Sequence, residues 1–113
     1  MRKPVSQEAY LAEFKAITDS MYALTQAKNS DYAGGEDAFR NFTMVEELTM
    51  GTITTEQGMF TRIIDKIMRL TTFIRKGTLQ VVDEKVEDTL LDLAVYSIIF
   101  ISYRRAQRKN EDN

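Results

Sequence analysis

Apolar residues recur along this chain at intervals of three and four, the spacing that places side chains on one face of a helix. The first stripe consists of Tyr10, Phe14, Ile17, Met21 and Leu24. The second consists of Phe60, Ile63, Ile64, Ile67 and Ile74. A third lies within the apolar run from Leu90 to Ile101. These stripes predict three long helices, over about residues 6–27, 54–76 and 84–108.

The segment between the first two stripes predicts an irregular insertion. Residues 28–35 are rich in Asn, Asp, Ser and Gly, which are common in turns, so they predict a loop. Thr43 and Glu46 have the spacing of a capping box. A short helix is therefore expected to begin there and to end near Gly51.

The second long helix has both a start and a stop signal. Thr54 and Gln57 have the spacing of another capping box, and Gly77 stands where glycine commonly ends a helix. Only a short connection, residues 78–83, leads to the final helix, so these two helices should pack as an antiparallel hairpin. The predicted fold is a single all-α domain over residues 1–113, with its core at about residues 6–108 and a polar tail that frays.

The final helix is more apolar than a domain of this size requires. Between Leu90 and Ile101 it is apolar on nearly every side, and a three-helix domain covers only part of such a helix. We therefore expect part of this helix to lie in a subunit interface of a homo-oligomer.

Composition narrows the possible partners and cofactors. The formal net charge of the 113 residues is -2, which argues against a nucleic-acid polymer as the ligand. The chain has no cysteine and no histidine, so a bound metal must be held by oxygen, which favours Mg²⁺, with Mn²⁺ as a substitute. No apolar run reaches the roughly 18–20 residues that span a membrane, and a cytoplasmic location is the simplest expectation.

Asp92 lies inside the most apolar stretch of the chain, where a charged group needs a partner. Glu84 and Asp88 precede it by two turns and one turn, so the three carboxylates share one helical face. Counting back from the connection places Asp65 within about one turn of Asp92. These four carboxylates are the predicted Mg²⁺ ligands, and Asp65, Asp88 and Asp92 are the predicted catalytic residues.

A plainer interpretation of the same residues stays open. Glu84 and Asp88 have the position of solvated first-turn residues that the helix dipole favours. Asp92 would then form an ion pair with a cation of the preceding helix, for which the candidates are Arg62, Lys66 and Arg69.

The same three cations, Arg62, Lys66 and Arg69, form with Asp65 a mixed-charge face opposite the isoleucine stripe. If this face lies beside the acidic stripe, the three cations are candidates to bind phosphate oxygens, with arginine offering a bidentate fork. The alternative is a solvent-exposed face with weak ion pairs between residues four apart.

Residues that suit a nucleobase or a sugar occur before the second stripe. The candidates are Asn29, Asp31, Tyr32 and Asn41. Tyr32 has a ring that stacks on a base, and the amides and carboxylate suit base edges or ribose hydroxyls. The same residue types are also ordinary turn formers.

Four blocks of the chain together resemble a known family. The blocks are Lys28–Tyr32, Asp37–Phe42, Arg62–Leu70 and Asp83–Ala94. They resemble the first type of the nucleotide-modification-associated domain family, small proteins found mostly in phages and prophages. The likeness spans about residues 25–100, and the block from Asp88 to Ala94 is specific. It implies a phage-encoded all-α protein that acts in nucleotide metabolism or DNA base modification in the bacterial cytoplasm.

The helical layout is more distantly similar to the MazG-like all-α nucleoside triphosphate pyrophosphohydrolases, which bind Mg²⁺ with carboxylates on two helices. The chain departs from their pattern at the carboxylates. Their Glu-x-x-Glu is reduced here to Asp65, and their Glu-x-x-Asp reads Thr89-x-x-Asp92, with Asp88 adjacent.

Three functional hypotheses follow. The first is a Mg²⁺-dependent hydrolase that releases pyrophosphate from a nucleoside triphosphate or a modified nucleotide. The second is a non-catalytic phage protein that binds a nucleotide, for instance to sequester it from a defence system, or that binds a host protein. The third is a helical oligomer in which Asp92 only fixes an interface through a salt bridge.

Overall fold

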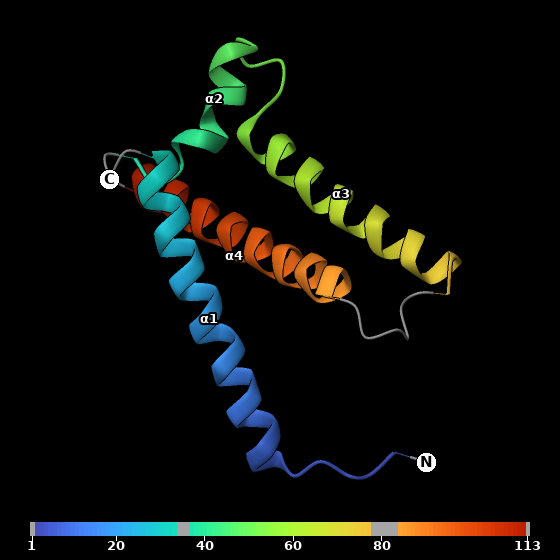
Figure 1. Ribbon diagram of the computed structural model, residues 1–113. Helices are drawn as coiled ribbons and strands as arrows, with labels where there is room; N and C mark the ends of the chain where they lie inside the picture. The colour runs from blue at the N-terminus through green and yellow to red at the C-terminus, as the bar shows by residue number, and fades with distance from the viewer. Residues whose placement is uncertain (1, 34–36, 78–83, 113) are drawn as a thin grey trace. The chain divides into compact units, whose positions relative to one another are not determined.

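The computed structural model describes residues 2–33, 37–77 and 84–112, without the side chains of residues 30–33, 84 and 112. Within these ranges the chain is all-α, as predicted, and contains no strand. The helices are α1 (Gln7–Ala33), α2 (Arg40–Leu48), α3 (Thr55–Arg75) and α4 (Glu84–Asp112) (Figure 1). They belong to two compact units, Met1–Glu36 with α1 and Asp37–Asn113 with the other three helices.

Helix α1 is longer than the apolar stripe predicted. The Ser6 hydroxyl accepts a hydrogen bond from the Ala9 amide at 3.1 Å, so Ser6 caps the start close to the predicted position. The predicted loop over residues 28–35 is wrong for its first part, because the helix continues to Ala33. Polar residues such as Lys28 cost little in a helix, and no glycine or proline follows until residue 34.

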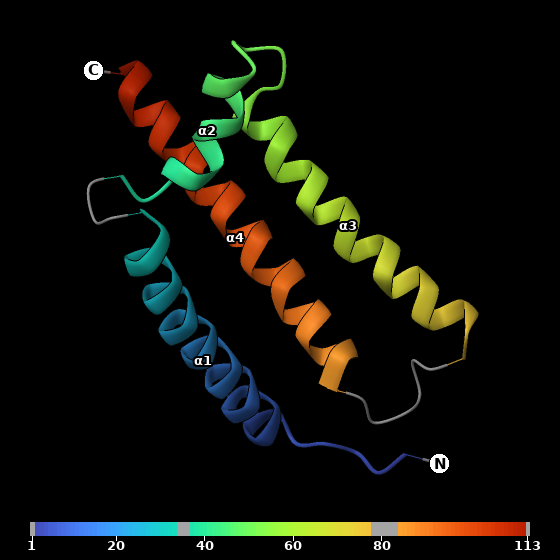
Figure 2. The same cartoon turned by 45° about the horizontal axis from the view of Figure 1, so that its top comes forward.

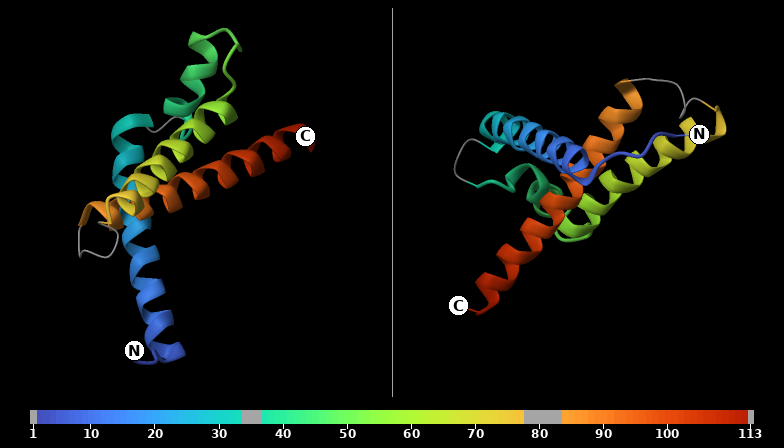
Figure 3. Two further views of the ribbon diagram at one scale, coloured as in Figure 1. Left: turned by 90° about the vertical axis from the view of Figure 1, so that its right-hand side faces the viewer. Right: turned by 90° about the horizontal axis from the view of Figure 1, so that it is seen from below.

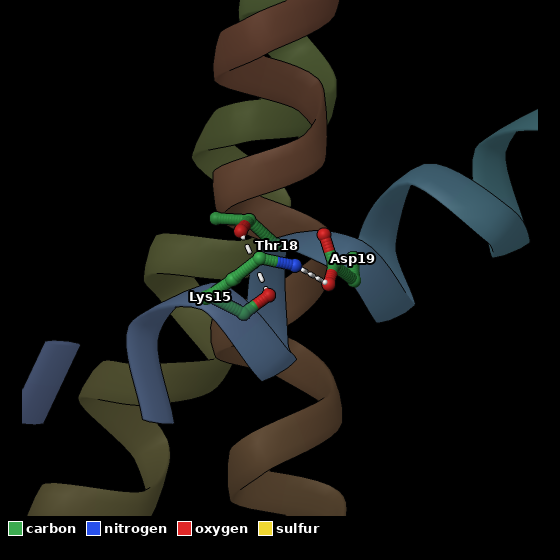
Figure 4. Close-up of polar contacts among 3 residues, drawn as sticks. All are labelled: Lys15, Thr18 and Asp19. Carbon is green, nitrogen blue, oxygen red and sulfur yellow. Dashed lines mark hydrogen bonds and ion pairs between the residues drawn. The ribbon is translucent and has the colours of Figure 1, made fainter. Parts of the chain in front are cut away.

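The exposed face of α1 carries an ion pair between residues one turn apart. The Lys15 ammonium lies 2.6 Å from the Asp19 carboxylate, and the Thr18 hydroxyl donates to the Lys15 carbonyl at 3.0 Å (Figure 4). The hydrogen bond to Asp19, together with the charge of Asp19, raises the pKa of Lys15 above its ordinary value.

Helix α2 does not begin with the predicted capping box. It begins at Arg40, so Thr43 already lies inside it and donates a hydrogen bond to the Arg40 carbonyl at 3.2 Å. Asp37 marks the entry instead, since its carboxylate accepts from the Phe39 amide at 3.0 Å. Glu46, the other half of the predicted box, accepts from the Thr55 hydroxyl at 3.3 Å and so joins α2 to α3.

The end of α2 also differs in detail from the prediction. Met50, with φ of 52°, occupies the left-handed position after the helix, and Gly51 follows it with φ of 82°. The Met50 amide donates to the Glu47 carbonyl at 3.1 Å and the Gly51 amide to the Glu46 carbonyl at 2.9 Å. This is a Schellman motif in which methionine holds the place that glycine usually takes.

The predicted limits of α3 are confirmed. The Thr54 hydroxyl accepts from the Gln57 amide at 3.1 Å, and the Gln57 side chain accepts from the Thr54 amide at 2.9 Å. At the other end Lys76 is the C-cap. Gly77 follows with φ of 71°, a conformation that favours glycine.

Helices α3 and α4 lie side by side in opposite directions, and α2 contacts α3 near its start (Figures 2 and 3). Their core is at the end where α3 begins, around the buried side chains of Phe42, Met59 and Tyr103. The rings of Phe39 and Tyr103 meet edge to face at 5.5 Å between centroids, so the residues before α2 also cover α4.

Helix α4 continues to Asp112, so the polar tail is helical rather than frayed through that residue. Tyr103 is its last buried residue, and the side chains described beyond it are exposed apart from half-buried Ala106. None of the helices in the described ranges has the length and apolar character needed to cross a membrane.

Candidate functional site

The centre of the candidate site is an ion pair between α3 and α4. The Lys66 ammonium lies 3.0 Å from the Asp92 carboxylate. The Lys66 side chain is 13% exposed and that of Asp92 is 38% exposed, so the lysine is the more deeply buried partner. Lys66 was one of three partners that the sequence left open for Asp92. The structure selects it.

The pairing follows from the spacing of residues on two antiparallel helices. Lys66 comes four residues after Arg62 on α3, and Tyr96 comes four residues after Asp92 on α4. Residues four apart share a helical face, so two antiparallel helices bring the pairs together in reverse order. Accordingly Lys66 pairs with Asp92 and Arg62 contacts Tyr96, and the Lys66 ammonium also lies 5.9 Å from the centroid of the Tyr96 ring.

Arg62 has aromatic rather than acidic neighbours. Its guanidinium carbon lies 4.7 Å from the centroid of the Phe42 ring and 5.9 Å from that of Tyr96. The Arg62 side chain is half-buried, and no carboxylate of the described residues lies within ion-pairing distance of it. The site therefore holds one neutralised cation, Lys66, and one cation whose charge is not neutralised, Arg62.

Arg62 borders a pocket of about 240 Å³ between α2 and the start of α3. The pocket is lined by Asn41, Phe42, Val45, Ile53, Gly58, Thr61 and Arg62. Its walls are mostly apolar, and its polar side chains are the Asn41 amide, the Thr61 hydroxyl and the Arg62 guanidinium. This combination of an apolar surface and a few polar groups is typical of small-molecule sites.

Gly58 allows α2 to come close enough to form this pocket. A Cβ atom placed on Gly58 would lie 2.9 Å from Cγ1 of Val45, which is closer than two carbon atoms approach without strain. Glycine is therefore required here by the packing of two helices rather than by the backbone conformation.

Among the described side chains, the predicted acidic residues are not gathered into a metal site. Asp65 and Asp88 are exposed, and the side chain of Glu84 lies outside the described part. Among the described side chains no group of three acidic residues is placed to hold a metal ion. Asp92 is already bound to an ammonium group. These side chains therefore do not fit Mg²⁺ in this arrangement, and we derive no catalytic step through a metal.

Within the second unit, the predicted base and phosphate residues are only partly brought together. Asn41 lines the same pocket as Arg62, whereas Arg69 is exposed on α3. Asn29 is half-buried in the last turns of α1, in the first unit. The side chains of Asp31 and Tyr32, two further predicted base or sugar residues, lie outside the described part.

Two aromatic residues belong to the site although the sequence analysis did not place them there. Phe42 and Tyr96 hold the Arg62 guanidinium between α2 and α4. The position of Tyr96 could have been predicted, because it follows Asp92 by four residues just as Lys66 follows Arg62. The position of Phe42 could not, since it depends on how α2 packs.

Comparison with known proteins adds no relative. No family model matches the chain, and no curated protein and no solved structure matches it.

Proposed function

We propose that this chain is a nucleotide-binding protein of the phage type, which binds a phosphate group of its ligand through Arg62 and breaks no bond in it. The observation that carries the proposal is the Arg62 guanidinium, which lies over two aromatic rings at the border of a pocket without a neighbouring described carboxylate. A cation in this setting is available for an anionic ligand.

The ring contacts suit Arg62 to phosphate. A guanidinium that packs against aromatic rings keeps its N–H groups at the edge, where they donate to two oxygens of one phosphate. Because Phe42 and Tyr96 come from different helices, they also limit the motion of the arginine, so less side-chain entropy is lost when the ligand binds.

The pocket beside Arg62 suits one part of a nucleotide. Phe42, Val45 and Ile53 offer apolar contact to a base or sugar, and the Asn41 amide both donates and accepts hydrogen bonds. Its 240 Å³ is below the roughly 300–1,000 Å³ of pockets that enclose a drug-sized ligand. The rest of the ligand would therefore remain in solvent.

The family resemblance supports a nucleotide as the source of the phosphate. The resemblance to the nucleotide-modification-associated family includes the block Arg62–Leu70, which contains the proposed phosphate residue. We propose that the protein acts in the cytoplasm of the bacterial host, where it holds a free or modified nucleotide away from other proteins.

Calorimetric titration with nucleoside mono- and triphosphates, and with inorganic phosphate, tests this function. Chelator is present throughout, so that binding does not depend on a divalent cation. Arg62→Met keeps the apolar stem and should weaken phosphate-dependent binding at least tenfold, while Arg62→Lys should restore part of it. Arg69→Met, on exposed α3 surface, is the matched control and should leave affinity unchanged. Equal binding by Arg62→Met and the wild type would contradict the proposal.

A Mg²⁺-dependent pyrophosphohydrolase is the second candidate. It rests on the distant resemblance to the MazG-like enzymes, whereas the described acidic side chains form no metal site, and Asp65 and Asp88 are simply exposed and form no ion pair within the described part of the chain. Incubation with nucleoside triphosphates and Mg²⁺ or Mn²⁺, followed by chromatography, decides between the two. Pyrophosphate release that Asp88→Asn abolishes would support the hydrolase, and recovery of intact nucleotide would support binding alone.

A further inference from the structure

Helix α3 carries a second apolar stripe that its contacts with α2 and α4 leave uncovered. The stripe consists of Phe60, Ile64, Ile67, Met68 and Ile74, whose exposed fractions range from 40 to 62%. Most of these residues belong to the isoleucine stripe of the sequence. The face that meets α4 is a different one, and it includes Lys66 and the contact of Arg62 with Tyr96.

The size of the stripe points to a protein partner. Five large side chains that are about half exposed offer roughly 400 Å² of apolar surface. That is comparable with the largest apolar patch of a typical monomer, about 300–600 Å², and such patches mark interaction sites. A standard interface buries about 800 Å² on each partner, so the stripe would supply about half of a dimer interface and the residues beside it would have to supply the rest.

The spacing of the stripe allows it to pack against the same stripe of a second copy of the chain. Ile67 lies near its middle, and Phe60 and Ile74 lie seven residues to either side. If a two-fold axis passes beside Ile67, antiparallel packing places Phe60 of each copy opposite Ile74 of the other. A two-fold interface uses the same patch on both subunits, and a stripe with equal arms meets that requirement.

The charges at the ends of α3 favour the same arrangement. Its first turn carries Glu56 and its last turn carries Arg75. In the antiparallel pair Arg75 of one copy lies level with residue 59 of the other, within about one turn of Glu56. Opposite charges, and opposite helix dipoles, therefore meet at both ends of the interface.

We propose that two copies of this chain associate through α3, with the α3 helices antiparallel and Ile67 of each copy at the two-fold axis. Association buries the stripe and leaves Asp65 and Arg69, which lie on the opposite side of α3, in solvent. This inference does not depend on the proposed nucleotide site, because neither Arg62 nor the residues of the pocket belong to the stripe.

The absence of cysteine from the chain allows a direct test on the whole chain of 113 residues. Ile67→Cys introduces a single thiol, and across the axis two such thiols lie within reach of a short bismaleimide, since packed helices are about 8–10 Å apart. The expected result is efficient cross-linking of Ile67→Cys to a covalent dimer, with little from the matched control Arg69→Cys.

Light scattering of the wild type and of Ile64→Glu/Ile67→Glu completes the experiment. The wild type should have twice the mass of one chain, and the double variant should have the mass of one chain with an unchanged helical circular dichroism spectrum. A monomeric wild type would overturn the proposal, as would cross-linking of Arg69→Cys as efficient as that of Ile67→Cys. If the protein is a monomer and the Ile67→Cys thiol resists alkylation, another part of the same chain covers the stripe. This result would also overturn the proposal.

Discussion

Removing one partner of the ion pair between Lys66 and Asp92 should destabilise the fold by an amount that depends on which partner is removed. Asp92→Asn leaves a lysine that is 13% exposed without its counter-charge, whereas Lys66→Met leaves a carboxylate that is 38% exposed and reached by water. An isolated buried charge costs more than an isolated charge in contact with solvent. The aspartate variant should therefore be the less stable one.

The magnitudes follow from the exposure of each partner. Exposed ion pairs contribute about 0.2–1 kcal/mol, and breaking a buried pair costs about 3–5 kcal/mol. Because solvent screens Asp92, we expect Asp92→Asn to lower the free energy of unfolding by about 2 kcal/mol. Lys66→Met should lower it by about 1 kcal/mol, because the methionine side chain replaces the lysine stem against Tyr96.

Urea unfolding followed by circular dichroism measures these values. The double variant Lys66→Met/Asp92→Asn leaves no unpaired charge, so its stability should be close to that of Lys66→Met alone, with a non-additivity of about 1–2 kcal/mol. Asp88→Asn, one turn earlier on α4 and exposed, is the control and should change stability by less than about 0.5 kcal/mol. A greater loss of stability in Lys66→Met than in Asp92→Asn would show that Lys66 is not the more costly charge to leave unpaired.

Three further predictions concern single residues of α1, of α3 and at the end of α2. Met50→Gly should raise the free energy of unfolding by about 0.5–1 kcal/mol in the same assay, because φ of 52° suits glycine better than methionine. Gly58→Ala should lower it by about 1–3 kcal/mol despite the better helix propensity of alanine, and adding Val45→Ala should restore part of the loss. The raised pKa of Lys15 means that its ion pair is present below the unfolded pKa and is lost as pH rises through the folded pKa. Asp19→Asn should therefore lower the NMR titration midpoint of Lys15.

The sequence predicted the structure best where a few neighbouring residues determine the local backbone. The capping box of Thr54 and Gln57 and the stop at Gly77 depend on neighbouring residues only, and both lie where they were predicted. The end of α1 was less predictable, because residues 28–33 tolerate both a loop and a helix. The same holds for Thr43, whose capping spacing is present but whose position is already inside α2.

The arrangement of the site depends on contacts between helices, which the local sequence pattern does not specify. In α3 the charged face lies opposite the isoleucine stripe, yet Lys66 of the charged face contacts α4 while Ile64 and Ile67 of the stripe are exposed. A charged pair replaces apolar contact at the centre of a helix interface, which hydrophobic periodicity alone does not indicate. The pocket beside Arg62 likewise depends on how closely α2 approaches Gly58.

The proposed function requires that Arg62 bind the phosphate of a nucleotide without a metal and that no bond of the nucleotide be cleaved. The most direct test titrates the wild type and Arg62→Met with the tightest-binding nucleotide of the panel, first with chelator and then with Mg²⁺, and recovers the nucleotide by chromatography. We predict binding in both buffers, at least a tenfold loss of affinity in Arg62→Met, and intact nucleotide. Binding that requires Mg²⁺, or a nucleotide recovered without its pyrophosphate, would contradict this account.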